Sequence, residues 1–200
     1  MDIENKLVTL EEIVRWQDQK IHNLTIPSDE RTRIVVGLID LGLEHEKSIG
    51  ILATNKFYGS GFALSRPLFE AYIRAVWLRN CATQDEIEKF KKGNIDKSFG
   101  ALIEDIEKLE AYDVQVLSDI KNKSWAIMND FTHGGVLQAL GRNKSEFIEP
   151  NYPKQDILGA IDFAISIGLF LTMEVAYIIS DENFAREVLE KIRVFSRDEA

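Results

Sequence analysis

The 200-residue chain is predicted to fold as a single-domain, all-α antiparallel bundle of about seven helices. Apolar residues recur with the helical period of 3.6 nearly everywhere, and strand-like alternation never extends beyond a few residues. Apolar residues make up 45% of the chain and charged residues 28%, which is an ordinary globular composition. No internal repeat or long linker divides the sequence, so we expect one helical domain over residues 1–200.

The first half of the chain predicts three helices. The first covers about residues 8–22, and the second begins with Ser28 as its N-cap. The segment Tyr58–Gly61 is a strong break. A third helix then continues to about Cys81, with Pro67 in its first turn or at a kink. The predicted buried stripe of the second helix consists of Ile34, Leu38, Leu41, His45, Ile49 and Leu52.

The second half predicts short helices followed by one long apolar helix. The expected ranges are about residues 84–92, 97–111, 113–133 with a continuation to Leu140, 153–180 and 183–197. Gly141, Pro150 and Pro153 indicate a loop before the long helix. Because the helix at 153–180 is apolar nearly all round, we expect it at the centre of the bundle or in the interface of a homo-oligomer such as a homodimer.

Composition and missing motifs exclude several classes of function. A formal net charge of −9 excludes a strongly basic protein that coats nucleic acid. One cysteine, Cys81, allows no intrachain disulfide and no cysteine zinc site. Without a P-loop or a Gly-x-Gly-x-x-Gly motif, no cofactor is expected. The first residues lack the pattern of a signal peptide, and the longest uncharged run, residues 163–173, is shorter than the roughly 20 residues that span a bilayer. We therefore expect a cytoplasmic protein that does not enter a membrane.

Arg66 and Glu70 occupy positions where the helical pattern favours apolar residues. They are four residues apart and can pair, and Arg74, four residues further on, can compete for Glu70. One interpretation is an arginine that is held by Glu70 for an anionic group, with Arg74 as a further ligand-binding residue. The alternative is a structural ion pair, either buried or at the surface.

A second polar group lies in the segment Asn129–Gly135. Asn129 and His133 are four apart, so the amide oxygen could orient the imidazole and fix its tautomer. Histidine is the usual proton-transfer residue, and Gly134 and Gly135 would let a ligand or another helix approach the backbone closely. The alternative is a core histidine whose hydrogen bonds are satisfied. His45, also on an apolar stripe, is a further ligand-binding candidate. No Glu-x-x-His pair accompanies it, so no metal site is expected.

The segment Ser65–Leu78 resembles the central helix of a bacterial all-α family of unknown function. The later His133-Gly134-Gly135 resembles the second hallmark of that family, and the match in order and spacing covers about residues 34–180. The resemblance implies an all-helical fold and carries no assigned activity.

Asn129 and His133 are also similar to the end of the motif of HEPN domains. These are helical bundles, often dimeric, that occur among toxins and anti-phage ribonucleases. Their motif is an arginine, commonly followed by a polar residue, and then a histidine. The resemblance implies acid–base chemistry by His133 at a ribose 2′-hydroxyl, with Asn129 as its positioner. The arginine is absent, because residues 126–128 are Ala, Ile and Met. Either Arg66 supplies the cation from another helix, or the bundle is not a nuclease of this type.

Three functional hypotheses follow. The first is a HEPN-like toxin or defence protein that acts on RNA, with Arg66, Glu70, Asn129 and His133 in its site. The second is a non-catalytic module that binds a protein partner or a second copy, in which the same residues form a structural network. The third is a sensor of a small anionic ligand such as a nucleotide, bound by Arg66 and the backbone of Gly134 and Gly135.

Overall fold

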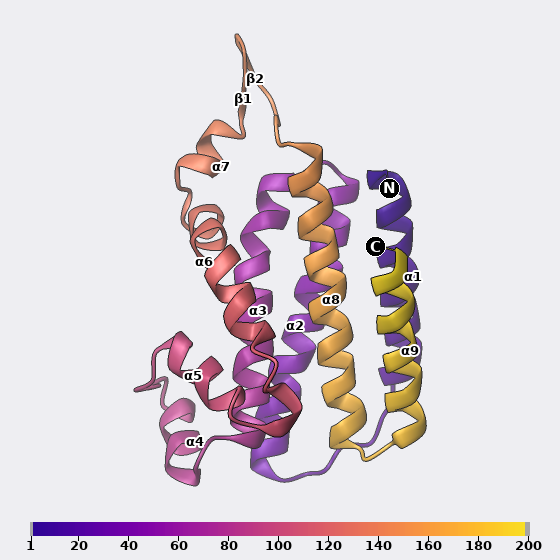
Figure 1. The fold of residues 1–200 in the computed structure, drawn as a ribbon, viewed down its shortest axis with the longest axis vertical. Helices are drawn as coiled ribbons and strands as arrows, with labels where there is room; N and C mark the ends of the chain where they lie inside the picture. The colour runs from indigo at the N-terminus through magenta and orange to yellow at the C-terminus, as the bar shows by residue number, and fades with distance from the viewer. Residues whose placement is uncertain (1, 199–200) are drawn as a thin grey trace.

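A computed structural model describes residues 2–198, and nearly all of them are helical (Figure 1). The described residues form nine α-helices: α1 (Ile3–Ile21), α2 (Glu30–Thr54), α3 (Tyr58–Asn80), α4 (Gln84–Lys91), α5 (Phe99–Ile106), α6 (Val116–His133), α7 (Val136–Leu140), α8 (Lys154–Ile178) and α9 (Glu182–Asp198). A 3₁₀ turn covers Glu110–Tyr112, and a small antiparallel hairpin pairs β1 (Asn143–Lys144) with β2 (Phe147–Ile148). The all-α prediction is confirmed, and the nine helices of the described residues are close to the expected number of about seven.

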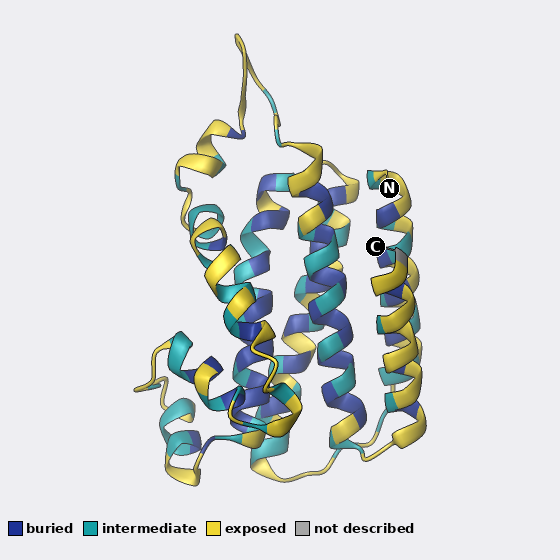
Figure 2. Cartoon of the chain, in the orientation of Figure 1, coloured by how far each residue is buried: buried dark blue, intermediate teal, exposed yellow. Residues whose placement is uncertain are grey.

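The long helices form the bundle and the short ones cover one side of it (Figure 1). α8 packs against α1, α2, α3 and α9, which confirms that the helix predicted at 153–180 is central. On its other side α3 packs against α5 and α6. Burial follows this arrangement, since α3 and α8 are largely buried while α7 and the hairpin are mostly exposed (Figure 2). The hairpin projects beyond the end of the bundle (Figure 1).

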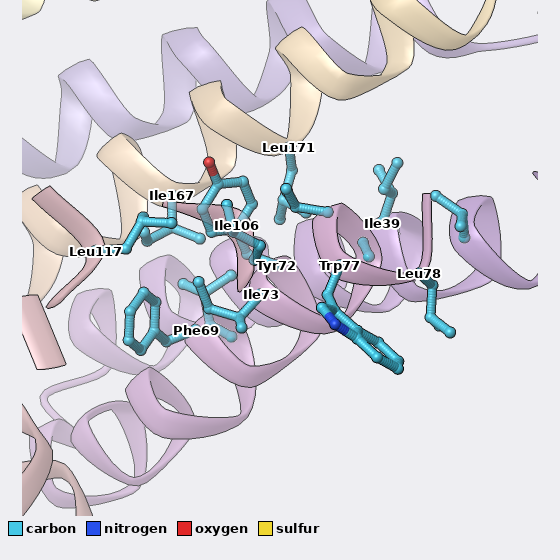
Figure 3. Close-up of a cluster of buried hydrophobic side chains, with 14 of the residues drawn as sticks. Ile39, Phe69, Tyr72, Ile73, Trp77, Leu78, Ile106, Leu117, Ile167 and Leu171 are labelled. Carbon is cyan, nitrogen blue, oxygen red and sulfur yellow. The ribbon is translucent and has the colours of Figure 1, made fainter. Parts of the chain in front are cut away.

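The main core forms around α3 (Figure 3). Phe69, Ile73 and Trp77 are at most 1% exposed and pack with side chains from α2, α5 and α8. Burying each large apolar side chain contributes about 1.5–3 kcal/mol. The same helix therefore anchors the core and carries Arg66 and Glu70 at its partly exposed edge.

Helix boundaries differ from the predicted ones where a better cap is available. α1 begins at Ile3, because Asp2 accepts the Ile3 N–H, and Asp29 rather than Ser28 caps α2 by accepting from Thr32 N–H. The break before α3 lies at residues 55–57, where Lys56 takes a φ of 60°. The glycines expected to form this break lie in the first turn of α3 instead.

In the second half, the helix predicted over 97–111 ends at Ile106 and is followed by the 3₁₀ turn. The helix predicted over 113–133 ends at His133, and Gly134 takes a left-handed φ of 67° that favours glycine. Its predicted continuation to Leu140 is the separate helix α7. The loop predicted at 141–153 contains the hairpin. α8 begins after Pro153, one residue later than predicted.

The buried face of α2 is one residue out of phase with the predicted stripe. The buried positions are Val35, Ile39, Gly42, Glu46, Ile49 and Ala53. Leu41 is exposed and His45 is half buried. Glu46 is a polar residue and Gly42 has no side chain, so the sequence of the buried face is less apolar than that of the predicted stripe. Both residues face α8, where Gly168 leaves room for the Glu46 carboxyl group and Leu171 lies against Gly42.

Pro67 lies well inside α3, where a proline removes one backbone donor and leaves the carbonyl four residues earlier without its helical partner. That carbonyl belongs to Ala63. The Oγ1 hydroxyl of Thr132 on α6 lies 3.2 Å from it, as well as 2.8 Å from the carbonyl of Met128. Because Pro67 leaves the Ala63 carbonyl free, Thr132 can form a polar contact between α3 and α6, one residue before His133.

α8 is the one described helix that is long and apolar enough to cross a membrane by length and composition. Central helices of soluble bundles pass the same test, and 56% of its most apolar stretch is buried within the bundle. Its contacts with four other helices account for this composition.

Candidate functional site

Arg66 of α3 and His133 of α6 meet on the surface of the bundle. Nη1 of Arg66 lies 2.6 Å from Nε2 of His133, although the residues are 67 positions apart in the chain. The Arg66 side chain is 25% exposed and His133 is exposed, so solvent and a ligand can reach the pair. The convergence of a guanidinium and an imidazole that the sequence hypotheses require is therefore present.

The contact assigns the roles of the two ring nitrogens. A guanidinium has five N–H donors, no acceptor and a permanent positive charge. Nε2 of His133 therefore accepts the hydrogen bond from Nη1, and the tautomer that fits this contact carries its N–H on Nδ1. A phosphate that took over the Nη1 donor would leave Nε2 free to accept a proton.

Glu70 holds two arginines at once. Its Oε1 accepts from Nε of Arg66 at 2.7 Å, and its Oε2 accepts from Nη1 of Arg74 at 2.6 Å. The Glu70 side chain is 16% exposed, and partial burial strengthens ion pairs because water screens them less. Two guanidinium groups share one carboxylate, so Arg66, Glu70 and Arg74 together carry one net positive charge.

The Arg66 guanidinium packs against a pair of stacked aromatic rings. The Arg66 guanidinium lies 5.0 Å from the centre of the Trp125 ring, within the range of a cation–π contact. Trp125 stacks on Phe99 at 4.4 Å, and Phe99 packs edge-on against the buried Phe69. Trp125 is the residue that the sequence analysis did not assign to the site. Its position eight residues before His133, on the same face of α6, could have indicated that it lies near the site.

No hydrogen bond joins Asn129 to the imidazole within the described residues. Its Oδ1 is buried and accepts no hydrogen bond from the described residues, so Arg66 rather than Asn129 determines the His133 tautomer. Three residues of the predicted site, Arg66, Glu70 and His133, are therefore joined by hydrogen bonds, and the fourth, Asn129, lies on α6 without joining them.

The two glycines form the turn between α6 and α7. The N–H groups of Gly134 and Gly135 both donate to the carbonyl of Asp130. The Asp130 carboxylate accepts from the N–H groups of Leu137 and Gln138, and a Cβ on Gly135 would overlap it. The Asp130 carboxylate thus already occupies backbone N–H groups in the first turn of α7. Anion binding by the backbone of Gly134 and Gly135 stays a prediction.

His45 lies apart from the cluster. It is half buried on α2, and burial lowers the pKa of its imidazole. No hydrogen bond or ion pair within the described residues joins it to Arg66, Glu70 or His133. Residues 2–198 also contain no group of three or more His, Cys, Asp or Glu side chains that could hold a metal ion.

Comparison with known proteins places the chain in a family. Residues 39–198, which include the whole cluster around Arg66 and His133, match the family of unknown function DUF6988. Searches of the curated proteins and of the solved structures found no match. The predicted resemblance to a family of unknown function is confirmed, whereas the similarity to HEPN domains stays a prediction. The chain is thus a member of DUF6988, a family of unknown function.

Proposed function

We propose that this cytoplasmic helical protein binds RNA at the Arg66–His133 cluster and cleaves it, as a toxin or defence protein would. The observation that supports the proposal most is the 2.6 Å contact between the two side chains at an accessible surface. Arginine recognises phosphate through paired N–H donors, and neutral histidine is a proton acceptor. The net positive charge of the cluster favours a phosphate locally, in a chain whose formal net charge is −9.

The proposed reaction is an internal transesterification. The phosphate takes the Nη1 donor of Arg66, and Nε2 of His133 accepts the proton of the neighbouring ribose 2′-hydroxyl. The 2′-oxygen forms a bond to phosphorus as the bond to the 5′-oxygen breaks, and the leaving oxygen takes a proton from water. The products are a 2′,3′-cyclic phosphate and a 5′-hydroxyl. Glu70 and Arg74 act as positioning residues, because Glu70 accepts from Arg66 and Arg74 in turn donates to Glu70.

We expect His133→Ala to lower the rate of cleavage of a single-stranded RNA oligonucleotide by about 100-fold or more, since general acid–base catalysis contributes about 10²–10⁴-fold. Arg66→Ala should lower it by a similar factor. The measurement is the rate of formation of cyclic-phosphate ends. His22→Ala is the matched control, because His22 is also exposed and lies at the end of α1.

Unfolding measured on the same variants separates this proposal from its alternative. His133 is exposed, so His133→Ala should change the free energy of unfolding by less than about 0.5 kcal/mol. Equal, background-level cleavage by wild type and His133→Ala would remove the enzymatic proposal. A clear loss of stability in His133→Ala without any change in activity would favour a structural network.

A second candidate function is a non-catalytic association module that binds a second copy of the chain. It is supported by an exposed apolar surface formed by α7 and the hairpin, in which Val136, Leu140, Phe147 and Ile148 are 61–85% exposed. Monomeric proteins rarely expose large contiguous apolar patches.

The test of association is molar mass measured by light scattering after size exclusion. Wild type should show the mass of a dimer, and the double variant Phe147→Ser with Ile148→Ser should be monomeric. Val114→Ser is the control, because Val114 is 73% exposed and lies outside this surface. A monomeric wild type at high concentration would exclude the homodimer.

A further inference from the structure

A cavity of about 650 Å³ lies between α3, α6, α8 and the loop that precedes α8. Phe62 of α3 and Phe131 of α6 line it, with ring centres 4.8 Å apart, and Tyr152 packs edge-on against Phe62 at 5.1 Å. Neither Arg66 nor His133 is part of its lining, so the cavity does not include the Arg66–His133 cluster. Its volume is within the range of about 300–1,000 Å³ that is typical of small-molecule sites.

On the side of the cavity that α8 forms, Gly159 leaves space where a side chain would otherwise lie. Gly159 lies inside the helix, where glycine is about 1 kcal/mol less favourable than alanine. A Cβ built on Gly159 would meet no atom within 4 Å, so no close approach of another element requires the glycine. The missing side chain leaves space in the cavity instead.

Part of the lining of the cavity is both apolar and exposed. Ile127, Leu137 and Leu140 line it and are 48%, 44% and 61% exposed, although residues of this kind are usually buried. An occupant that covered them would remove this apolar surface from water, which is favourable by about 25 cal/mol per Å². The lining therefore favours an apolar occupant.

The few polar groups restrict the charge of the occupant. Asp156 is the one charged residue of the lining, and no Lys, Arg or His of the described chain is part of it. Asp156 is exposed and lies in the first turn of α8. A ligand carboxylate or phosphate would be placed next to a negative charge without a cation to balance it, whereas an ammonium group would be attracted.

The volume argues against a helix of a protein partner. A helix about 10 Å across advances 5.4 Å per turn, so 650 Å³ holds fewer than about two turns. We propose that this cavity binds a small apolar molecule with a cationic head group, such as a long-chain or aromatic amine, through its aromatic walls and Asp156. This site is independent of RNA cleavage and would remain if that activity were absent.

Binding of Nile red, a neutral apolar dye that fluoresces more strongly outside water, tests the site. Wild type should bind the dye saturably, and Gly159→Phe should weaken binding by at least about tenfold, because the new ring occupies the cavity. Gly37→Phe is the matched control. Gly37 is also an exposed glycine inside a helix, and a Cβ there also meets nothing within 4 Å. Phe147→Ser with Ile148→Ser should bind the dye as wild type does.

Displacement by two molecules of equal chain length tests the head group without depending on the Gly159 variant. Decylamine should displace Nile red at a lower concentration than decanoate, and Asp156→Asn should reduce that difference. Equal dye binding by wild type and folded Gly159→Phe would overturn the site. Dye binding lost in the Phe147→Ser and Ile148→Ser variant would overturn it too, in favour of the exposed surface. Equal displacement by decanoate would overturn the choice of a cationic head group.

Discussion

Trp77→Ala should lower the free energy of unfolding by about 3–5 kcal/mol, the range for truncating a buried tryptophan. Trp77 is 1% exposed and lies in the main core (Figure 3). Its Nε1 donates to the Asp105 carboxylate at 3.3 Å, and Nζ of Lys97 lies 5.4 Å from the ring centre. Truncation therefore removes core packing, a hydrogen bond and a cation–π contact together. Because single domains are stable by only about 5–15 kcal/mol, this is a large share of the total.

Denaturant unfolding at constant pH measures this loss. Val114→Ala is the control, because Val114 is 73% exposed and its truncation should change stability by less than about 0.5 kcal/mol. A loss below about 1 kcal/mol for Trp77→Ala would contradict the described position of Trp77, since even smaller core truncations commonly exceed it.

The second large effect is a pH dependence caused by Glu46. Glu46 is fully buried between α1, α2 and α8, and neither oxygen accepts a hydrogen bond from the described residues. Burial raises the pKa of this carboxyl well above its usual 4.5, with a smaller contribution from Asp18, and Gln17 offsets the rise only in part. From α8, the polar neighbour in this region is Thr172, which receives a hydrogen bond from Gln17.

The sign of the effect follows from proton binding. Between pH 4.5 and the folded-state pKa, folded Glu46 keeps its proton while the unfolded carboxyl has lost it. The stability that protonation provides is therefore complete below pH 4.5 and is lost as the pH rises, by up to about 1.4 kcal/mol per pH unit. Glu46→Gln cannot titrate, so its stability relative to wild type should increase between pH 5 and 8.

Unfolding free energies at several pH values measure the difference in slope, which does not depend on how well the new amide fits. Glu44→Gln is the matched control, since Glu44 is exposed on the same helix. Parallel pH profiles for wild type and Glu46→Gln would show that Glu46 ionises normally in the folded protein.

The hydrophobic pattern was enough to predict which helices are central but not how each is rotated. α8 has apolar residues on every side, so any rotation buries them and its central place was predictable. On α2 two neighbouring stripes were both plausible, and the buried one contains Glu46. The structure explains this choice by Gly168 on α8, a residue more than 100 positions away. A pattern within one helix carries no information about such a partner.

The candidate site shows the same limit. Spacing of four residues predicted the Arg66–Glu70 and Glu70–Arg74 pairs, because neighbours on one helix are fixed by helical geometry. The same rule suggested an Asn129–His133 hydrogen bond, which is absent among the described residues, whereas Nε2 of the ring accepts from Arg66 on another helix. Contacts between helices depend on how far each is shifted along the other, and the printed sequence does not encode that shift in any local pattern.

The carbonyl of Ala63 has a consequence for how the family can vary. The relative position of α3 and α6 is set by packing contacts, including Thr132 against that carbonyl and Phe99 of α5 between Phe69 and Trp125. Insertions in the mostly exposed loop at residues 92–98, between α4 and α5, should therefore be tolerated in relatives, as loops generally tolerate them. One residue inserted between Pro67 and Glu70 would instead rotate the guanidinium and the carboxylate about 100° apart, so gaps in an alignment of relatives should avoid that turn.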